Sequence, residues 1–137
     1  MTPPPSVLLD SDTLSAITRN HSQAVANSRA YLQTNTRLSI SIITRFEVLR
    51  GLKVKSANRQ LAIFESFCVG NEVLDITDSI IVKAADIYAD LHKRGLLIGD
   101  ADILIAATAL VHGYAVATNN ERHFQRIPGL QLENWLK

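Results

Sequence analysis

Short apolar runs alternate along the chain with longer stretches in which apolar residues recur at helical spacing. The short runs predict strands at 7–9, 38–42, 72–76, 114–117 and 130–135. The longer stretches predict helices from residue 13 and over 21–34, 44–53, 56–70, 77–95 and 99–112. Strands that alternate with helices in this way are typical of an α/β domain with a mainly parallel sheet.

This order of elements predicts a central sheet flanked by helices, as in an α/β/α sandwich. We expect a single domain over residues 1–137, with a proline-containing leader at 1–6. Parallel sheets bind ligands at the carboxyl ends of their strands, near the point where the strand order reverses. Functional side chains are therefore expected directly after the predicted strands.

Several polar residues stand where helix caps belong. Asp12 is predicted to cap the helix that begins at residue 13, and Ser56 to cap the helix over 56–70. Thr44 and Glu47 have the spacing of a capping box, in which each side chain bonds a backbone N–H at the helix start. Asp100 is a candidate cap for the helix over 99–112.

The composition is that of an ordinary folded protein. A hydrophobic fraction of 47% excludes wholesale disorder, and a net charge of +1 excludes a global field that would attract nucleic acid or membrane. The single cysteine, Cys68, excludes an internal disulfide and suits a reducing cytoplasm. No signal peptide pattern and no run of about 20 apolar residues is present, so we expect a cytoplasmic protein without a membrane partner.

Three acidic residues stand close to strand ends. Asp10 follows the first strand, Glu47 lies one turn beyond the second, and Asp102 begins a helix that is apolar on nearly every face. If the three converge, their mutual repulsion requires a cation, and an oxygen-only ligand set favours Mg²⁺ or Mn²⁺. Phosphodiester hydrolysis needs such a site, because the metal lowers the pKa of a bound water and neutralises charge on the phosphate.

Each of these acids also has a structural interpretation. Asp10 could serve a turn or a cap, Glu47 the capping box, and Asp102 the helix dipole. Besides its predicted role as a helix cap, Asp12 is a candidate to support the acidic site. Thr118 follows a strand and could orient a water or a carboxylate, or serve only as a turn hydroxyl.

Basic residues gather around Glu47. Five of them lie between positions 45 and 59, where Glu47 is the only acid. The functional interpretation is an RNA-binding patch beside the acidic site, formed by Arg45, Arg50 and Lys53. The structural interpretation is a solvated helix face.

Four segments together resemble the motifs of PIN-domain ribonucleases, especially the VapC toxins of bacterial type II toxin–antitoxin systems. They are 8–15 (LLDSDTLS), 41–51 (SIITRFEVLRG), 98–107 (IGDADILIAA) and 117–124 (ATNNERHF), followed by 127–130 (IPGL) and 133–135 (ENW). The resemblance implies an endoribonuclease dependent on Mg²⁺ or Mn²⁺, in which Asp10 and Asp102 bind metal and Glu47 completes the catalytic acidic cluster. It also implies an RNA substrate, a homodimer and inhibition by a cognate antitoxin.

The chain departs from that family pattern at the fourth acidic position. Asn119 and Asn120 occupy this turn; Asn120 is expected to support the site by hydrogen bonding, without charge, and Glu121 is the alternative replacement. Two other functions remain open. One is a non-catalytic RNA-binding or regulatory PIN-like module, and the other is a structural protein–protein module in which the acids are helix caps.

Overall fold

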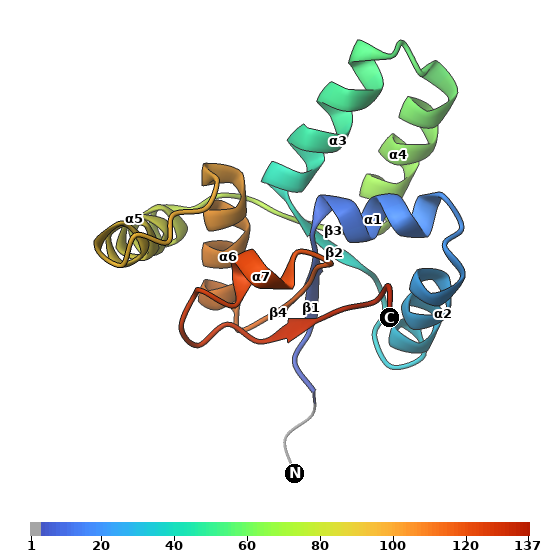
Figure 1. Ribbon diagram of the computed structural model, residues 1–137. Coiled ribbons are helices and arrows are strands. Elements are labelled where there is room, and N and C mark those ends of the chain that lie inside the picture. The colour runs from blue at the N-terminus through green and yellow to red at the C-terminus, as the bar shows by residue number, and fades with distance from the viewer. Residues whose placement is uncertain (1–3) are drawn as a thin grey trace.

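The computed structural model describes residues 4–137 and has a five-stranded sheet at its centre (Figure 1). The strands are β1 Val7–Leu9, β2 Ser39–Ser41, β3 Glu72–Leu74, β4 Ala115–Ala117 and β5 Leu132–Glu133. All neighbours pair in parallel, in the order β3-β2-β1-β4-β5. Strands β2 and β3 are added on one side of β1, and β4 and β5 on its other side. The strand order therefore reverses between β1 and β4.

The helices cover both faces of the sheet (Figure 1). They are α1 Ser11–Thr18, α2 Ser22–Leu32, α3 Ile42–Val54, α4 Asn58–Gly70, α5 Asp78–Lys93, α6 Asp100–His112 and α7 Glu121–Phe124. Helices α5 and α6 pack together on one side, α1 and α2 lie on the other, and α3 and α4 form a hairpin that projects from one end. The predicted α/β/α architecture with a parallel sheet is confirmed; the four-residue helix α7 was not predicted.

Two apolar cores lie on opposite faces of the sheet, because successive strand residues point to opposite faces. Leu8 and Val116 belong to the core beneath α5 and α6, whereas Val7 and Leu9 belong to the core beneath α1 and α4. Strands β1 and β4 are buried on both faces and are apolar throughout, as is typical of parallel sheets. Strand β2 is equally buried but alternates serine with isoleucine.

The starts of α1 and α3 differ from the sequence prediction. Asp10, not Asp12, caps α1, since its Oδ1 accepts the Thr13 N–H at 2.8 Å. Ser41 caps α3 by accepting the Thr44 N–H at 3.1 Å, so the helix begins earlier than predicted and the strand before it is shorter. The predicted caps at Asp12 and Thr44 are therefore wrong, because each helix begins directly after its strand.

Three further helix starts can be compared with the prediction. Ser56 has a left-handed backbone, with φ of 52°, and α4 begins after Ala57, so the predicted Ser56 cap is wrong. Asp100 is the first residue of α6 and Gly99 holds the cap position, so the predicted Asp100 cap is wrong. The helix predicted over 77–95 is α5, and Thr77 caps it by accepting the Ile80 N–H at 3.3 Å.

Within residues 4–137, no helix combines the length and apolar character needed to cross a bilayer. The first three positions of the predicted leader at 1–6 lie outside the described residues. The backbone joins the sheet at Ser6, whose carbonyl accepts the Ala115 N–H at 2.9 Å. Strand β1 is thereby aligned with β4 from its first residue, so Asp10 and Thr118, which come directly after these strands, lie at the same edge of the sheet.

Candidate active site

Asp10 lies at the end of β1, next to the point where the strand order reverses. Its side chain is buried, with 5% of the residue exposed, and accepts hydrogen bonds from the Thr13 backbone and from the Thr118 side chain. Burial raises the pKa of Asp10, and these hydrogen bonds offset part of that rise. A carboxylate held in this way is costly to ionise, so a nearby positive charge would stabilise it.

Asp102 lies in the first turn of α6, with about a third of its side chain exposed. Burial raises its pKa, and the negative charge of Glu47 raises the pKa further. The charge of Asp12 also raises the pKa of Asp102, by less than Glu47 does. His123 lowers this pKa, and its Nδ1 lies 3.9 Å from Asp102 Oδ2. Asp102 and Glu47 are thus close enough for their charges to interact, although 55 positions separate them in the chain.

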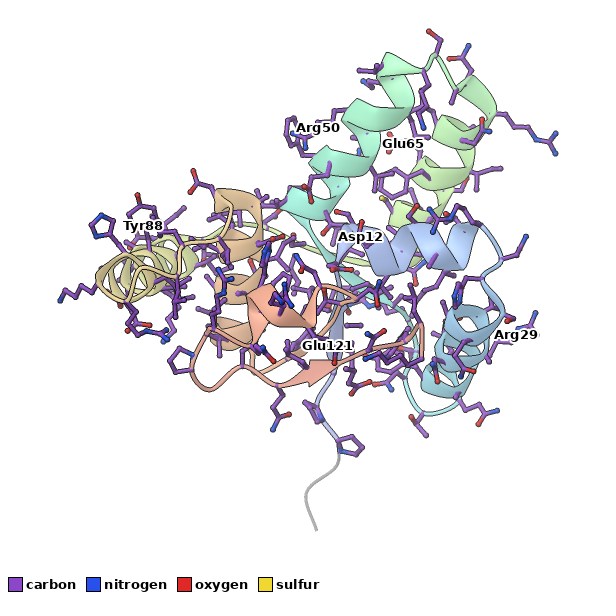
Figure 2. The ribbon with its side chains drawn as sticks, in the orientation of Figure 1. Asp12, Arg29, Arg50, Glu65, Tyr88 and Glu121 are labelled. Carbon is purple, nitrogen blue, oxygen red and sulfur yellow. The ribbon has the colours of Figure 1, made fainter. Side chains whose placement is uncertain are left out.

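Glu47 points from α3 towards α1. Its Oε1 accepts a hydrogen bond of 2.6 Å from Ser11 Oγ, and its Oε2 lies 3.8 Å from Arg50 Nη2. The capping-box interpretation of Glu47 fails, because α3 begins at Ile42 and is capped by another residue. Asp12, at the start of α1, is exposed and lies beside the base of α3 (Figure 2).

The predicted acids therefore lie at one edge of the sheet, but they do not form a compact ligand group. Across residues 4–137, no three His, Cys, Asp or Glu side chains approach closely enough to hold a metal ion. Asp10 is engaged as a helix cap, Glu47 is held by Ser11, and Asp102 faces His123. The sequence predicted that Asp10, Glu47 and Asp102 converge in one pocket. The structure does not show them as a cluster of three metal ligands.

The residues at this edge nevertheless fit a hard divalent cation. Mg²⁺ keeps several of its waters and commonly uses only one or two carboxylates, so a three-carboxylate cage is not required. Asp10 and Asp102 both have raised pKa values, which a cation would lower. The Thr44 hydroxyl, one turn from Glu47 on the same face of α3, is buried and has no hydrogen-bond partner among the described residues. Asp10 and Asp102 are the residues that would hold the ion.

The turn after β4 adds uncharged polar groups. Asn120 donates its backbone N–H to Thr118 Oγ1 at 2.9 Å, and its Nδ2 lies 2.8 Å from His123 Nδ1. Thr118 in turn bonds Asp10, so this turn connects to the carboxylates through Thr118 and His123. The turn therefore supplies hydrogen bonds near the acids without adding charge.

Glu121 is occupied elsewhere. Its Oε2 accepts hydrogen bonds of 3.0 Å from both Asn134 and Lys137, and these bonds lower its pKa. The residue lies on α7, on the side of the C-terminal segment (Figure 2). Of the two predicted replacements for a fourth acid, Asn120 has the connection to the other acids and Glu121 is bound to the end of the chain.

The predicted basic patch is divided between two faces of α3. Arg45 pairs with Glu65 of α4, whereas Arg50 lies beside Glu47 and over the Phe46 ring, 5.1 Å from its centroid. Arg45 and Arg50 are about 140° apart around the helix, which explains the division. Arg50 and Glu65 appear on different sides of α3 (Figure 2). Lys53 lies in the last turn and lowers the pKa of Glu65.

Sequence reasoning missed two residues that contact the acids. Ser11 bonds Glu47, and its only sequence signal was its position directly after Asp10. His123 faces Asp102, but in the sequence it was one of four scattered histidines. Its spacing of three residues from Asn120 could have indicated a shared helical face.

An open groove of about 590 Å³ runs from the acids between α1 and the α3–α4 hairpin. Asp12 and Glu47 lie at its edge, and most of its remaining lining is apolar, including Leu52, Phe64 and Phe67. The groove leaves Glu47 open to an incoming molecule from this side.

Residues 7–130 match the PIN domain family. A tRNA(fMet)-specific endonuclease VapC from Salmonella typhimurium is 36% identical over 129 residues, which cover 93% of this chain and 96% of the relative. Ribonuclease VapC1 from Methanocaldococcus jannaschii is 40% identical over 95 residues, covering 69% of this chain and 68% of that protein.

Solved structures show the same fold. The VapBC2 complex of Rickettsia felis, bound to a DNA fragment from its promoter, contains a chain that matches with a TM-score of 0.84 and 28% identity, over 94% of this chain and 98% of that one. In the DNA-bound VapBC of Salmonella typhimurium, a chain matches with a TM-score of 0.83 and 34% identity, over 96% of this chain and 98% of that one.

Proposed function

We propose, from the premise that the chain belongs to the PIN-domain family, that its acids at the carboxyl edge of the sheet hydrolyse RNA with the help of Mg²⁺ or Mn²⁺. The observation that supports this site is that the acids lie together at this edge of the sheet. Ser11, which directly follows Asp10, bonds Glu47 at 2.6 Å, and the charge of Glu47 in turn raises the pKa of Asp102. Carboxylates that repel one another at a ligand-binding edge are stabilised by a divalent cation.

Asp10 and Asp102 would hold the cation, which when bound would lower the pKa of a water and neutralise charge on the phosphate. Attack of that water on phosphorus breaks the P–O bond to one ribose oxygen, and this leaving oxygen takes a proton from solvent. Glu47 orients the attacking water and accepts its proton, and Ser11 fixes the direction of Glu47 through the 2.6 Å hydrogen bond. Thr118 orients Asp10 from the end of β4. Asn120 contributes a hydrogen bond to a water or a phosphate oxygen.

RNA is the proposed substrate class because the curated relatives are named as ribonucleases, one of them as specific for tRNA(fMet). Arg50 is the basic residue best located for a phosphate, since it lies beside Glu47 and keeps more than half of its side chain exposed. Lys53, one turn further along α3, extends the positive charge. Arg45 is proposed as a weaker contributor, because Glu65 already neutralises it.

The proposed biological role is that of a toxin in a type II toxin–antitoxin pair. Similar chains in solved structures belong to VapBC complexes, which supports a cognate antitoxin as partner. We also propose a homodimer. Large apolar side chains are exposed on α5, including Ile81, Val82 and Tyr88, which points outward in Figure 2.

The decisive test is RNA cleavage with and without Mg²⁺. Wild-type protein is expected to cleave RNA, and chelation with EDTA should abolish cleavage. Glu47→Gln and Asp102→Asn are each expected to lower kcat by about 100-fold or more, because they remove the proton acceptor and a metal-binding charge. Asp86→Asn, the same chemical change on an exposed face of α5, is the matched control and should retain activity.

A non-catalytic RNA-binding module is the second candidate, favoured by the uncharged turn at Asn120 and the open spacing of the acids. It predicts RNA binding by the wild type, measured by fluorescence anisotropy, with no metal-dependent cleavage. Circular dichroism of each variant separates a loss of activity from a loss of fold. Cleavage that survives in purified Asp102→Asn protein would contradict the proposed catalytic site.

A further inference from the structure

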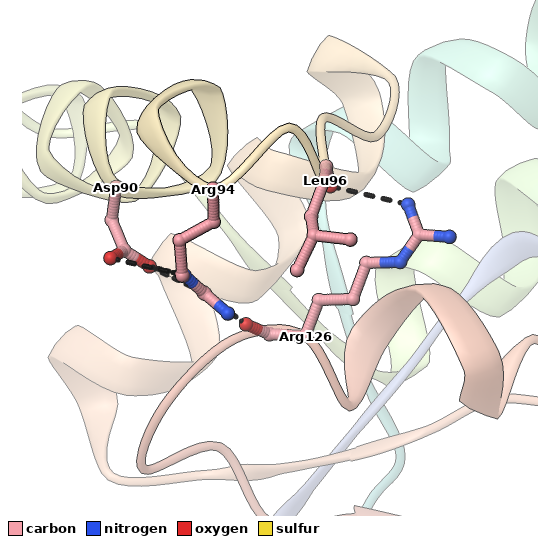
Figure 3. A network of polar contacts seen from close by, with 4 residues as sticks. All are labelled: Asp90, Arg94, Leu96 and Arg126. Carbon is pink, nitrogen blue, oxygen red and sulfur yellow. Dashed lines mark hydrogen bonds and ion pairs between the residues drawn. The ribbon is translucent and has the colours of Figure 1, made fainter.

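Two arginines, Arg94 and Arg126, join the segment before α6 to the segment after α7 (Figure 3). These segments flank the contact between Asp102 and His123. Arg126 Nη1 donates to the carbonyls of Leu96 and Leu97, at 3.2 and 3.3 Å. Arg94 Nη2 donates to the carbonyl of Arg126 at 2.6 Å. Each arginine therefore binds the backbone of the other segment, and we call these three bonds the arginine clamp.

Both segments joined by the clamp lie within a few residues of the acidic site. Leu97 is three residues before the start of α6, which bears Asp102 in its first turn. Arg126 is three residues after His123, whose Nδ1 is 3.9 Å from the Asp102 carboxylate. The clamp thus fixes the connection into α6 against the connection out of α7.

The segments are also anchored beneath the clamp. Ile98 and Ile127, which follow Leu97 and Arg126 directly, are buried in the same apolar core. Arg94 is braced in turn by Asp90, whose carboxylate oxygens lie 3.2 and 3.3 Å from its Nε. The core holds the side chains, and the clamp holds the backbone that carries them.

We propose that Arg126 is a positioning residue for Asp102. The inference rests on the proposed function, because it assigns Arg126 to the same acidic site. The charges of Glu47 and Asp12 repel Asp102, and a carboxylate in the first turn of a helix moves with that turn. The cap position of α6 is Gly99, which has no side chain to fix the helix start. Arg126 supplies that constraint from outside the helix.

Arginine suits this role better than lysine. Its planar guanidinium can donate to two adjacent carbonyls with fixed geometry, as it does at Leu96 and Leu97, whereas an ammonium is a flexible point charge. Arg126→Lys should therefore keep the charge and restore only part of the constraint. This difference separates positioning from a simple contribution of positive charge.

The test compares Arg126→Met, Arg126→Lys and the wild type in the full chain. Mn²⁺ binding is measured by titration calorimetry, and steady-state RNA cleavage gives kcat and KM. For Arg126→Met we expect Mn²⁺ affinity about tenfold weaker and a fall in kcat larger than any rise in KM, because residues that orient a metal ligand typically have effects of this size. Arg126→Lys should lie between the two. Hydrogen exchange over 96–102 should become faster in Arg126→Met.

Arg122→Met is the matched control, since Arg122 is an exposed arginine of α7, four positions before Arg126, and this variant should behave like the wild type in each measurement. Mn²⁺ affinity within twofold of the wild type in Arg126→Met would overturn the proposal. If Arg126→Met does not fold, Arg94→Met removes the reciprocal bond and should show a smaller loss of Mn²⁺ affinity; no loss there would also overturn it. A wild type that binds Mn²⁺ but does not cleave RNA would refute the proposed function, while the Mn²⁺ comparison would still test Arg126.

Discussion

Asp10 has two roles, as the cap of α1 and as a buried carboxylate at the proposed metal site. As the cap of α1 it satisfies the Thr13 N–H, and any hydrogen-bond acceptor of similar shape would serve there. As a buried carboxylate it must ionise to bind a cation, although burial raises its pKa. A negative charge retained in a buried position is typical of residues kept for function at a cost in stability.

We therefore predict that Asp10→Asn stabilises the protein at pH 7, by roughly 0.5–2 kcal/mol in the free energy of unfolding. Asparagine keeps an oxygen for the Thr13 N–H and has no charge to desolvate. Because the folded-state pKa of Asp10 is raised, the advantage of the variant should shrink as the pH falls through that pKa and vanish below the ordinary value of 3.8. Urea unfolding at pH 7 and at low pH measures this difference, and a variant less stable than the wild type at pH 7 would contradict it.

At the scale of a single helix, the backbone conformation at the helix ends determines where functional residues lie. Helix α6 begins with the turn that contains Asp102 and ends at Gly113, which has a left-handed backbone with φ of 72°. The Gly113 N–H bonds the carbonyl of Leu110 and thereby closes the last turn. The chain then enters β4 directly, and β4 leads back to the acidic edge.

Gly113→Ala is expected to lower the free energy of unfolding by about 1–2 kcal/mol, because an L-residue resists the left-handed region. Open space surrounds this position, so the loss would come from the backbone alone. Gly51→Ala is the matched control. It makes the same change within α3, also in open space, and should raise stability by about 0.5–1 kcal/mol. Thermal unfolding of both variants tests the pair, and a shift of the same sign in both would contradict this explanation.

At the scale of the whole molecule, the parallel sheet gathers residues that are far apart in the chain. Pairing of β1 with β4 brings Ala117 next to the start of α1, where its carbonyl accepts the Thr13 hydroxyl from a residue 104 positions away. The same pairing sets Thr118 beside Asp10. The acidic edge is therefore a product of strand order, at the point where that order reverses.

The proposed homodimer is a prediction about the surface of the whole molecule. Light scattering coupled to size-exclusion chromatography should give about twice the chain mass of 15.1 kDa. Val82→Glu would place a charge on the exposed apolar surface of α5 and should shift the protein towards the monomer. A monomeric wild type at micromolar concentration would contradict the homodimer without affecting the assignment of the acidic site.

The sequence by itself determined the alternation of strands and helices, the parallel sheet and the family, because these depend on local periodicity and on motifs read along the chain. It also identified Asp10, Glu47 and Asp102, since each stands beside a strand end or a helix start. Their catalytic roles stay predictions.

Only the tertiary structure decided what each side chain contacts. The cap of α1 is Asp10 rather than Asp12, because the helix begins as soon as β1 ends. Glu47 bonds Ser11, and Asp102 faces His123, through contacts between distant segments that no local pattern encodes. The physical reason is that periodicity reports the face of an element, whereas a hydrogen bond depends on where the packing of the sheet sets a second element.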